Sequence, residues 1–160
     1  MKPKWILIAE DNPIDADLAL RSLGASNTGE EIVLAEDGAK ALDCLYRRGD
    51  YESRSAGLPA MVMLDMKMPK VDGLEVLQKI KSDPQLKHIP VVMFTSSREE
   101  YDLIHCYENG ANAYVVKPVT FPEFRTTLQH LKTFWIGLNE LPSGDPNRIG
   151  SGTPQFAPAA

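Results

Sequence analysis

Chemically active side chains follow four short apolar runs of this chain. They are Glu10 and Asp11 after 5–9, Asp65 after 60–64, Thr95 and Ser96 after 91–94, and Lys117 after 112–116. Apolar runs of this length are typical of strands that are buried on both faces of a parallel sheet. Because parallel strands end at one edge of the sheet, where open α/β sheets bind ligands, the sequence predicts that these side chains meet there.

Three of these groups are carboxylates, which would repel one another at a shared site. At about 4 Å and an effective dielectric near 20, each pair costs roughly 4 kcal/mol. A divalent cation would relieve this repulsion, and a ligand set of oxygens without His or Cys favours Mg²⁺. Lys117 and Thr95 are then free to hold an anion against the metal, as a phosphoryl site requires. The acid after the central strand, Asp65, is the natural nucleophile, and its product is an aspartyl phosphate.

Alternating strands and helices are predicted to position these groups. The predicted strands span 5–9, 31–35, 60–65, 91–94 and 112–116, and the predicted helices span 13–23, 38–48, 73–82, 98–108 and 120–138. Such alternation indicates an α/β fold with a doubly wound parallel sheet, helices on both faces and right-handed crossovers.

Capping residues mark the expected helix boundaries. Asn12 is expected to cap the first helix, with Asp15 complementing the dipole in its first turn and Ile14 on its apolar face. Asp72 and Glu75 fit a capping box for the third helix. The last helix is predicted to keep one apolar face for nearly five turns, through Phe121, Phe124, Leu128, Leu131, Phe134, Trp135 and Leu138.

Composition and charge narrow the class of protein. A net charge of −5 argues against nucleic-acid binding and a polybasic membrane patch, and no apolar stretch reaches the roughly 18 residues of a membrane span. Cys44 and Cys106 match no metal or disulfide spacing, which indicates reduced cysteines and a cytoplasmic protein. Residues 1–141 are expected to form one domain, and the polar, Pro/Gly-rich segment 142–160 a flexible tail with no output domain.

The strand-end residues resemble the receiver domain of two-component response regulators. The matching segments are Ala9-Glu10-Asp11-Asn12, Met63-Leu64-Asp65-Met66-Lys67-Met68-Pro69-Lys70-Val71-Asp72-Gly73, Phe94-Thr95-Ser96, and Gly110-Ala111 followed by Lys117-Pro118. The resemblance covers roughly residues 4–138 and implies a flavodoxin-like (βα)5 fold with strand order 2-1-3-4-5. It also implies that Asp65 accepts a phosphoryl group from a histidine kinase.

The resemblance further implies a metal site. Asp11 and Asp65 would bind Mg²⁺ directly, Glu10 mainly through water, and the backbone carbonyl of Lys67 would be a further ligand. Lys67 is a departure, because many receivers carry Asn, Arg or Met at this position. Its side chain is expected to lean over the phosphorylation site and to affect the lifetime of the phosphoryl group.

Roles in phosphoryl binding and switching follow from the same resemblance. Thr95 and Lys117 would contact the phosphoryl oxygens, and the small Ser96 would leave the approach to Asp65 open. Thr95 and Tyr114 would form a switch pair, in which the hydroxyl moves toward the phosphate and the aromatic ring turns inward. The Lys117–Pro118 peptide bond would be cis, which proline permits at a small cost.

A narrower resemblance is to the stand-alone regulators paired with bacterial phytochrome histidine kinases. It is carried by the long loop 49–59, by the segment 88–99, and by Phe134-Trp135 followed by Leu141-Pro142. It implies a homodimer through the face formed by the fourth helix, fifth strand and fifth helix. The candidate residues for this face are Tyr101, Tyr114, Phe134 and Trp135.

Two other functions share parts of this pattern. A Mg²⁺-dependent phosphohydrolase with an aspartyl-phosphate intermediate would carry a second aspartate two residues after the nucleophile, where this chain has Lys67. A flavin-binding protein of the same fold would need a Ser/Thr/Gly-rich turn after the first strand, where this chain has Glu10 and Asp11. The pattern therefore favours a phosphoacceptor that is not an enzyme and signals by switching protein–protein contacts.

Overall fold

The computed structural model describes residues 4–24, 31–54 and 57–142. The loop expected at 25–30 and the tail expected beyond 142 lie outside these residues. The strands are β1 (Trp5–Ala9), β2 (Glu31–Ala35), β3 (Met61–Leu64), β4 (Val91–Thr95) and β5 (Ala113–Val116). The α-helices are α1 (Pro13–Leu23), α2 (Gly38–Tyr46), α3 (Gly73–Ser82), α4 (Glu100–Glu108) and α5 (Phe121–Lys132). A 3-10 turn (Gly49–Tyr51) and a π-helix (Thr133–Leu138) complete the described elements.

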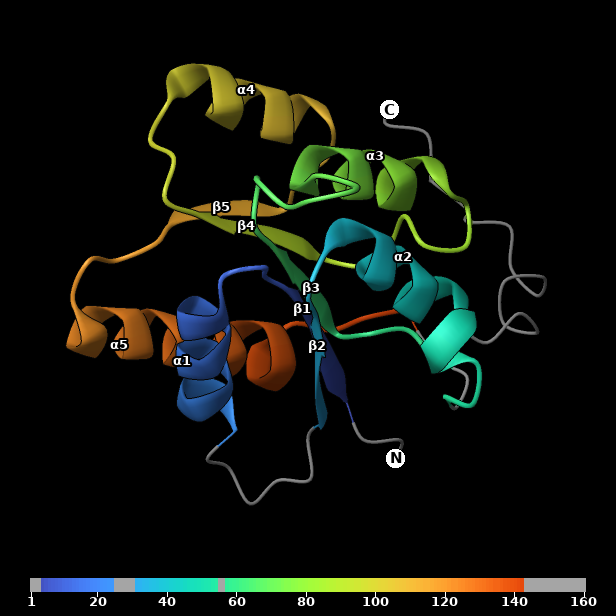
Figure 1. The fold of residues 1–160 in the computed structure, drawn as a ribbon, viewed down its shortest axis with the longest axis horizontal. Coiled ribbons are helices and arrows are strands. Elements are labelled where there is room, and N and C mark those ends of the chain that lie inside the picture. The colour runs from blue at the N-terminus through green and yellow to red at the C-terminus, as the bar shows by residue number, and fades with distance from the viewer. Residues whose placement is uncertain (1–3, 25–30, 55–56, 143–160) are drawn as a thin grey trace, which may run out of the picture.

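The five strands form one parallel sheet in the order β2-β1-β3-β4-β5. Helices α1 and α5 cover one face, and α2, α3 and α4 cover the other (Figure 1). The predicted flavodoxin-like fold and strand order are therefore confirmed. Since all strands run in one direction, the residues that follow them gather at one edge of the sheet.

Strand residues alternate between two hydrophobic cores, one under each helical layer. Leu7 of β1 and Val62 of β3 enter the core beneath α2 and α3, whereas Ile8 and Met63 enter the core beneath α1 and α5. Both faces of these strands are buried, which accounts for their continuous apolar runs. None of the helices in the described part of the chain combines the length and hydropathy that a membrane span requires.

The apolar face predicted for α1 is partly wrong. Ile14 is 67% exposed, because it lies in the first turn, where the helix starts at the sheet edge. The buried positions are Ala16, Ala19 and Leu23. Asn12 caps the helix as predicted, since its side-chain oxygen accepts hydrogen bonds from the backbone N–H groups of Ile14 and Asp15.

The single long helix predicted over 120–138 is also wrong in its second half. The α-helical hydrogen bonding ends at Lys132 and gives way to the π-helix. A π-turn takes in more residues than an α-turn, so it rotates the following side chains relative to the α-helical pattern. As a result Ile136 is buried, while Phe134 and Leu138 are exposed. Phe121 is exposed at the other end, in the first turn of α5.

Gly73 allows the start of α3 to lie directly against the residue that follows β3. Its backbone N–H donates to the Met66 carbonyl at 2.9 Å. A Cβ atom at this position would overlap the backbone carbonyl oxygen of Asp65. The absence of a side chain at residue 73 therefore permits this close packing against the backbone of Asp65.

We expect Gly73→Ala to lower the free energy of unfolding by roughly 2–3 kcal/mol, because the new methyl group must push backbone atoms apart. Urea denaturation monitored by circular dichroism measures this change. Gly137→Ala is the matched control, since a Cβ there meets no atom within 4 Å. It should leave stability unchanged or raise it slightly. Equal stability of Gly73→Ala and the parent would contradict the overlap.

Candidate functional site

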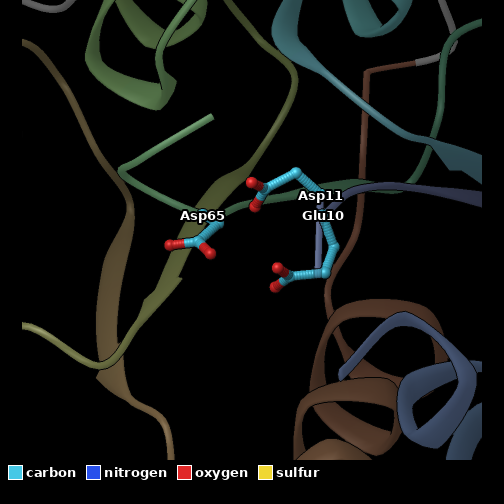
Figure 2. Close-up of side chains that lie close together, drawn as sticks. All are labelled: Glu10, Asp11 and Asp65. Carbon is cyan, nitrogen blue, oxygen red and sulfur yellow. The ribbon is translucent and has the colours of Figure 1, made fainter. Parts of the chain in front are cut away.

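Three carboxylates meet at the carboxyl ends of β1 and β3. Glu10 and Asp11 directly follow β1, Asp65 directly follows β3, and the two strands pair side by side. One carboxylate oxygen from each residue lies within 4.8 Å of the others. Figure 2 shows the three side chains gathered around a common space. Glu10 is only 5% exposed, Asp65 is half-buried and Asp11 is exposed.

This cluster has the donor set of a site for a hard divalent cation. All the candidate ligands are oxygens, and they approach from two adjacent strands. Burial raises the pKa of Glu10 to about 7, and the neighbouring Asp65 carboxylate adds to this rise, while Lys117 opposes it. The raised pKa reflects mainly the cost of burying the charged carboxylate, with repulsion from Asp65 as a smaller part, and a bound cation would offset both.

Lys117 donates hydrogen bonds to three carboxylates. Its Nζ lies 2.6 Å from Glu10 Oε2, 2.8 Å from Asp15 Oδ2 and 3.1 Å from Asp65 Oδ2. The side chain is 9% exposed. Burial disfavours the ammonium form, but the hydrogen bonds to Asp15 and Glu10 and the charge of Asp65 outweigh it and raise the pKa of Lys117. The lysine therefore stays charged at the centre of the site.

The sequence did not reveal the hydrogen bond between Asp15 and Lys117. The place of Asp15 in the first turn of α1 indicated only a favourable interaction with the helix dipole. In the structure its carboxylate turns back to Lys117, across 102 positions of the chain. The available signal was that Asn12 starts α1 directly at the sheet edge, which brings the first turn beside the strand ends. Lys117 thus has a third carboxylate partner besides Glu10 and Asp65.

Thr95, the last residue of β4, is buried and joins the loop that leads to α4. Its Oγ1 accepts a hydrogen bond from the backbone N–H of Ser97 at 3.2 Å. The Ser97 hydroxyl donates to Asp102 on α4 at 2.6 Å, and the Ser97 carbonyl accepts from the Tyr114 hydroxyl at 3.0 Å. Ser97 therefore connects Thr95, α4 and β5, a role that the sequence did not reveal. Helix α4 begins at Glu100, two residues later than the sequence predicts.

A pocket of about 550 Å³ opens beside Asp65. Its lining residues come from the loops after β3 and β4: Asp65, Lys67, Thr95, Ser96, Ser97, Arg98 and Glu99. The side chains of Lys67 and Ser96 are exposed at this pocket. A small donor or a partner's side chain therefore has room to approach the Asp65 carboxylate.

The expectation of a cis Lys117–Pro118 bond is wrong, because this bond is trans. The trans form is intrinsically favoured by about 0.5–1 kcal/mol at X–Pro bonds. With this backbone, Lys117 reaches the carboxylates while its own N–H donates to the Thr95 carbonyl at 2.8 Å.

The four residues predicted for a dimer face differ in exposure. Tyr101 on α4 is 69% exposed, and its ring lies tilted against that of His105, with 4.3 Å between the ring centroids. Phe134 is 47% exposed and meets the Trp135 ring edge-on at 4.8 Å between centroids. Tyr114 and Trp135 are half-buried, and Trp135 packs against the core beneath α1 and α5. Tyr101 and Phe134 therefore offer the larger apolar surfaces.

The fold and the site together define a doubly wound α/β protein with a carboxylate cluster, a lysine and a threonine at the carboxyl edge of its sheet. The family model of the response regulator receiver domain matches residues 6–129. The chain therefore belongs to the response regulator receiver domain family.

Several relatives agree with this assignment. Response regulator Rcp1 of Synechocystis sp. is 37% identical over 141 residues, which cover 88% of this chain and 95% of Rcp1. The structure of Mn²⁺-bound Rcp1 superposes with a TM-score of 0.81 over 88% of this chain and all of that chain. The structure of the phosphorylated cyanobacterial phytochrome response regulator RcpA superposes with a TM-score of 0.83. It is 37% identical, and the match covers 89% of this chain and all of that chain. The structure of the bacteriophytochrome response regulator AtBRR superposes with a TM-score of 0.70. It is 53% identical, and the match covers 88% of this chain and all of the AtBRR chain.

Proposed function

We propose that Asp65 accepts a phosphoryl group from the phosphohistidine of a sensor histidine kinase, in a Mg²⁺-dependent reaction. The observation that carries this proposal is the setting of Asp65. Its carboxylate lies beside Glu10 and Asp11, 3.1 Å from the Lys117 ammonium, and lines an open pocket. A nucleophile, a cation site and a fixed positive charge thus converge where phosphoryl transfer requires them.

In the proposed reaction an Asp65 carboxylate oxygen attacks phosphorus. An O–P bond forms, the N–P bond of phosphohistidine breaks, and its electron pair returns to the imidazole. Glu10, Asp11, Asp65 and the backbone carbonyl of Lys67 would hold Mg²⁺, which supplies charge neutralisation at the phosphoryl oxygens.

Lys117 and Thr95 complete the proposed site around the phosphoryl group. Lys117 would transfer a hydrogen bond from the carboxylates to a phosphoryl oxygen, and the Thr95 hydroxyl would donate to another. The chain would thereby assist its own phosphorylation and later dephosphorylation without turning over a separate substrate. A phosphohydrolase is disfavoured, because the position of its second aspartate holds Lys67, which lines the pocket and cannot serve as its acid–base.

The contacts of Ser97 support a switch from Thr95 to the α4–β5 surface. If the Thr95 hydroxyl turns to a phosphoryl oxygen, it gives up its contact with the Ser97 N–H. Ser97 is also hydrogen-bonded to Asp102 and Tyr114, so a movement of Ser97 would displace or break contacts with α4 and β5. A second link is the Cys106 sulfur on α4, which lies 3.2 Å from the sulfur of Met66, the residue after Asp65.

The upstream partner that we propose is a phytochrome-type histidine kinase. Support comes from the similarity to RcpA and AtBRR, which are themselves described as phytochrome or bacteriophytochrome response regulators. We also place the protein in the cytoplasm, because Cys44 and Cys106 are both free and buried in the structure.

Incubation with acetyl phosphate and Mg²⁺ should add one phosphoryl group to the protein. Intact-mass spectrometry detects this gain, which should disappear without the metal and in Asp65→Ala, since each change removes an essential part of the site. Asp17→Ala on the exposed side of α1 is the matched control and should react like the parent. A phosphoryl group that persists in Asp65→Ala would refute the assignment of the phosphoacceptor.

Lys67→Asn should shorten the lifetime of the phosphoryl group several-fold. The long cationic side chain lines the pocket with Asp65, where it both attracts the phosphoryl dianion and occupies space that water needs for attack. The decay of the phosphorylated mass after removal of acetyl phosphate gives the rate. Lys87→Asn, at an exposed lysine beyond α3, serves as the control. Equal decay of Lys67→Asn and the parent would remove Lys67 from the mechanism.

We also propose that the chain forms a homodimer through the α4–β5–α5 face, with Tyr101 and Phe134 as the more exposed of the four aromatic residues predicted for it. Their exposure supports this, because large apolar side chains at the centre of an interface carry most of its binding energy. Tyr114 and Trp135 would contribute only through the parts of their side chains that remain exposed.

Tyr101→Ala and Phe134→Ala should each weaken the dimer about tenfold or more. Sedimentation equilibrium measures the dissociation constant, in the presence and absence of phosphorylation. Leu58→Ala is the control, because Leu58 is a similarly exposed apolar residue in the loop before β3. A parent protein that stays monomeric at every concentration would contradict the proposed dimer.

A further inference from the structure

Asp15 is the one Lys117 partner that does not belong to the carboxylate cluster. The cluster that could hold a cation consists of Glu10, Asp11 and Asp65. Lys117 binds one oxygen of Glu10 and one of Asp65, and it also binds Asp15 at 2.8 Å. The Asp15 side chain is 28% exposed, so it lies closer to solvent than the Lys117 side chain, which is 9% exposed.

Lys117 and a divalent cation compete for the same carboxylates. A cation held by Glu10 and Asp65 would sit beside oxygens that now accept hydrogen bonds from the ammonium, and two positive charges at such close range repel. Lys117 is nearly buried, so it cannot move into water to avoid this repulsion. It needs another negative partner at its present position.

We propose that Asp15 is a positioning residue that retains the Lys117 ammonium beside the site and so lets a divalent cation take Glu10 and Asp65. This inference rests on the proposed metal site. With Asp15 present, metal binding exchanges two of the lysine's three partners and leaves the third. Without it, the lysine depends on the two carboxylates that the metal requires, and it resists their release.

Asp15→Asn should weaken Mn²⁺ binding about five- to tenfold. The measurement is the free Mn²⁺ signal in electron paramagnetic resonance during titration of the full chain at about 0.15 M salt, where exposed charges are screened beyond roughly 8 Å. Asp15→Glu keeps the negative charge and should stay within about twofold of the parent. Asp17→Asn removes a charge that lies on the same helix and pairs with Arg21, so it should bind as the parent does.

A double-mutant cycle separates positioning from simple loss of charge. In the Lys117→Met background there is no ammonium to retain, so adding Asp15→Asn should change the Mn²⁺ dissociation constant by less than about twofold. Circular dichroism confirms that each variant is folded before titration. An equal loss in both backgrounds would overturn the proposal, and so would unchanged binding in Asp15→Asn alone. Failure of the parent to bind Mn²⁺ is a distinct result, which would overturn the metal site and the role of Asp15 together.

Discussion

Electrostatic repulsion among carboxylates at the ends of β1 and β3 is the constraint on which this site depends. The parallel sheet brings Glu10, Asp11 and Asp65 close together, and the half-buried setting strengthens their repulsion. The structure meets this by burying the Lys117 ammonium among them. The site therefore favours a bound positive charge, and it places the Asp65 carboxylate next to an open pocket.

In the proposed switch, communication away from Asp65 would depend on short polar contacts in the loop after β4. Thr95 is buried at the sheet edge, yet its hydroxyl bonds only to the nearby Ser97 N–H among the contacts described. Ser97 holds α4 through Asp102 and β5 through Tyr114. Hydrogen bonds thus connect Thr95 continuously to α4 and β5. Each of these bonds can be tested by substituting either of its two partners.

The fold and the central residues of the site could be predicted from the sequence because buried strands and capping residues leave local patterns. The five apolar runs gave the strands, and their parallel order placed Asp65 beside Glu10 and Asp11. The contact between Asp15 and Lys117 could not be predicted in this way, since it depends on the direction of one helix turn relative to a distant loop. The π-helical turn near Phe134 could not be predicted either, because its residues also fit a regular α-helix.

The π-helix at the end of α5 makes this region more sensitive to a change in length than to a change in residue type. Each added or removed residue in a helix turns everything after it by about 100°. Loss of one residue between Thr133 and Ile136 would turn Ile136 away from its buried position. Small insertions and deletions here thus offer a simple evolutionary route by which related chains can acquire a different exposed surface while the sheet edge that carries Asp65 stays unchanged.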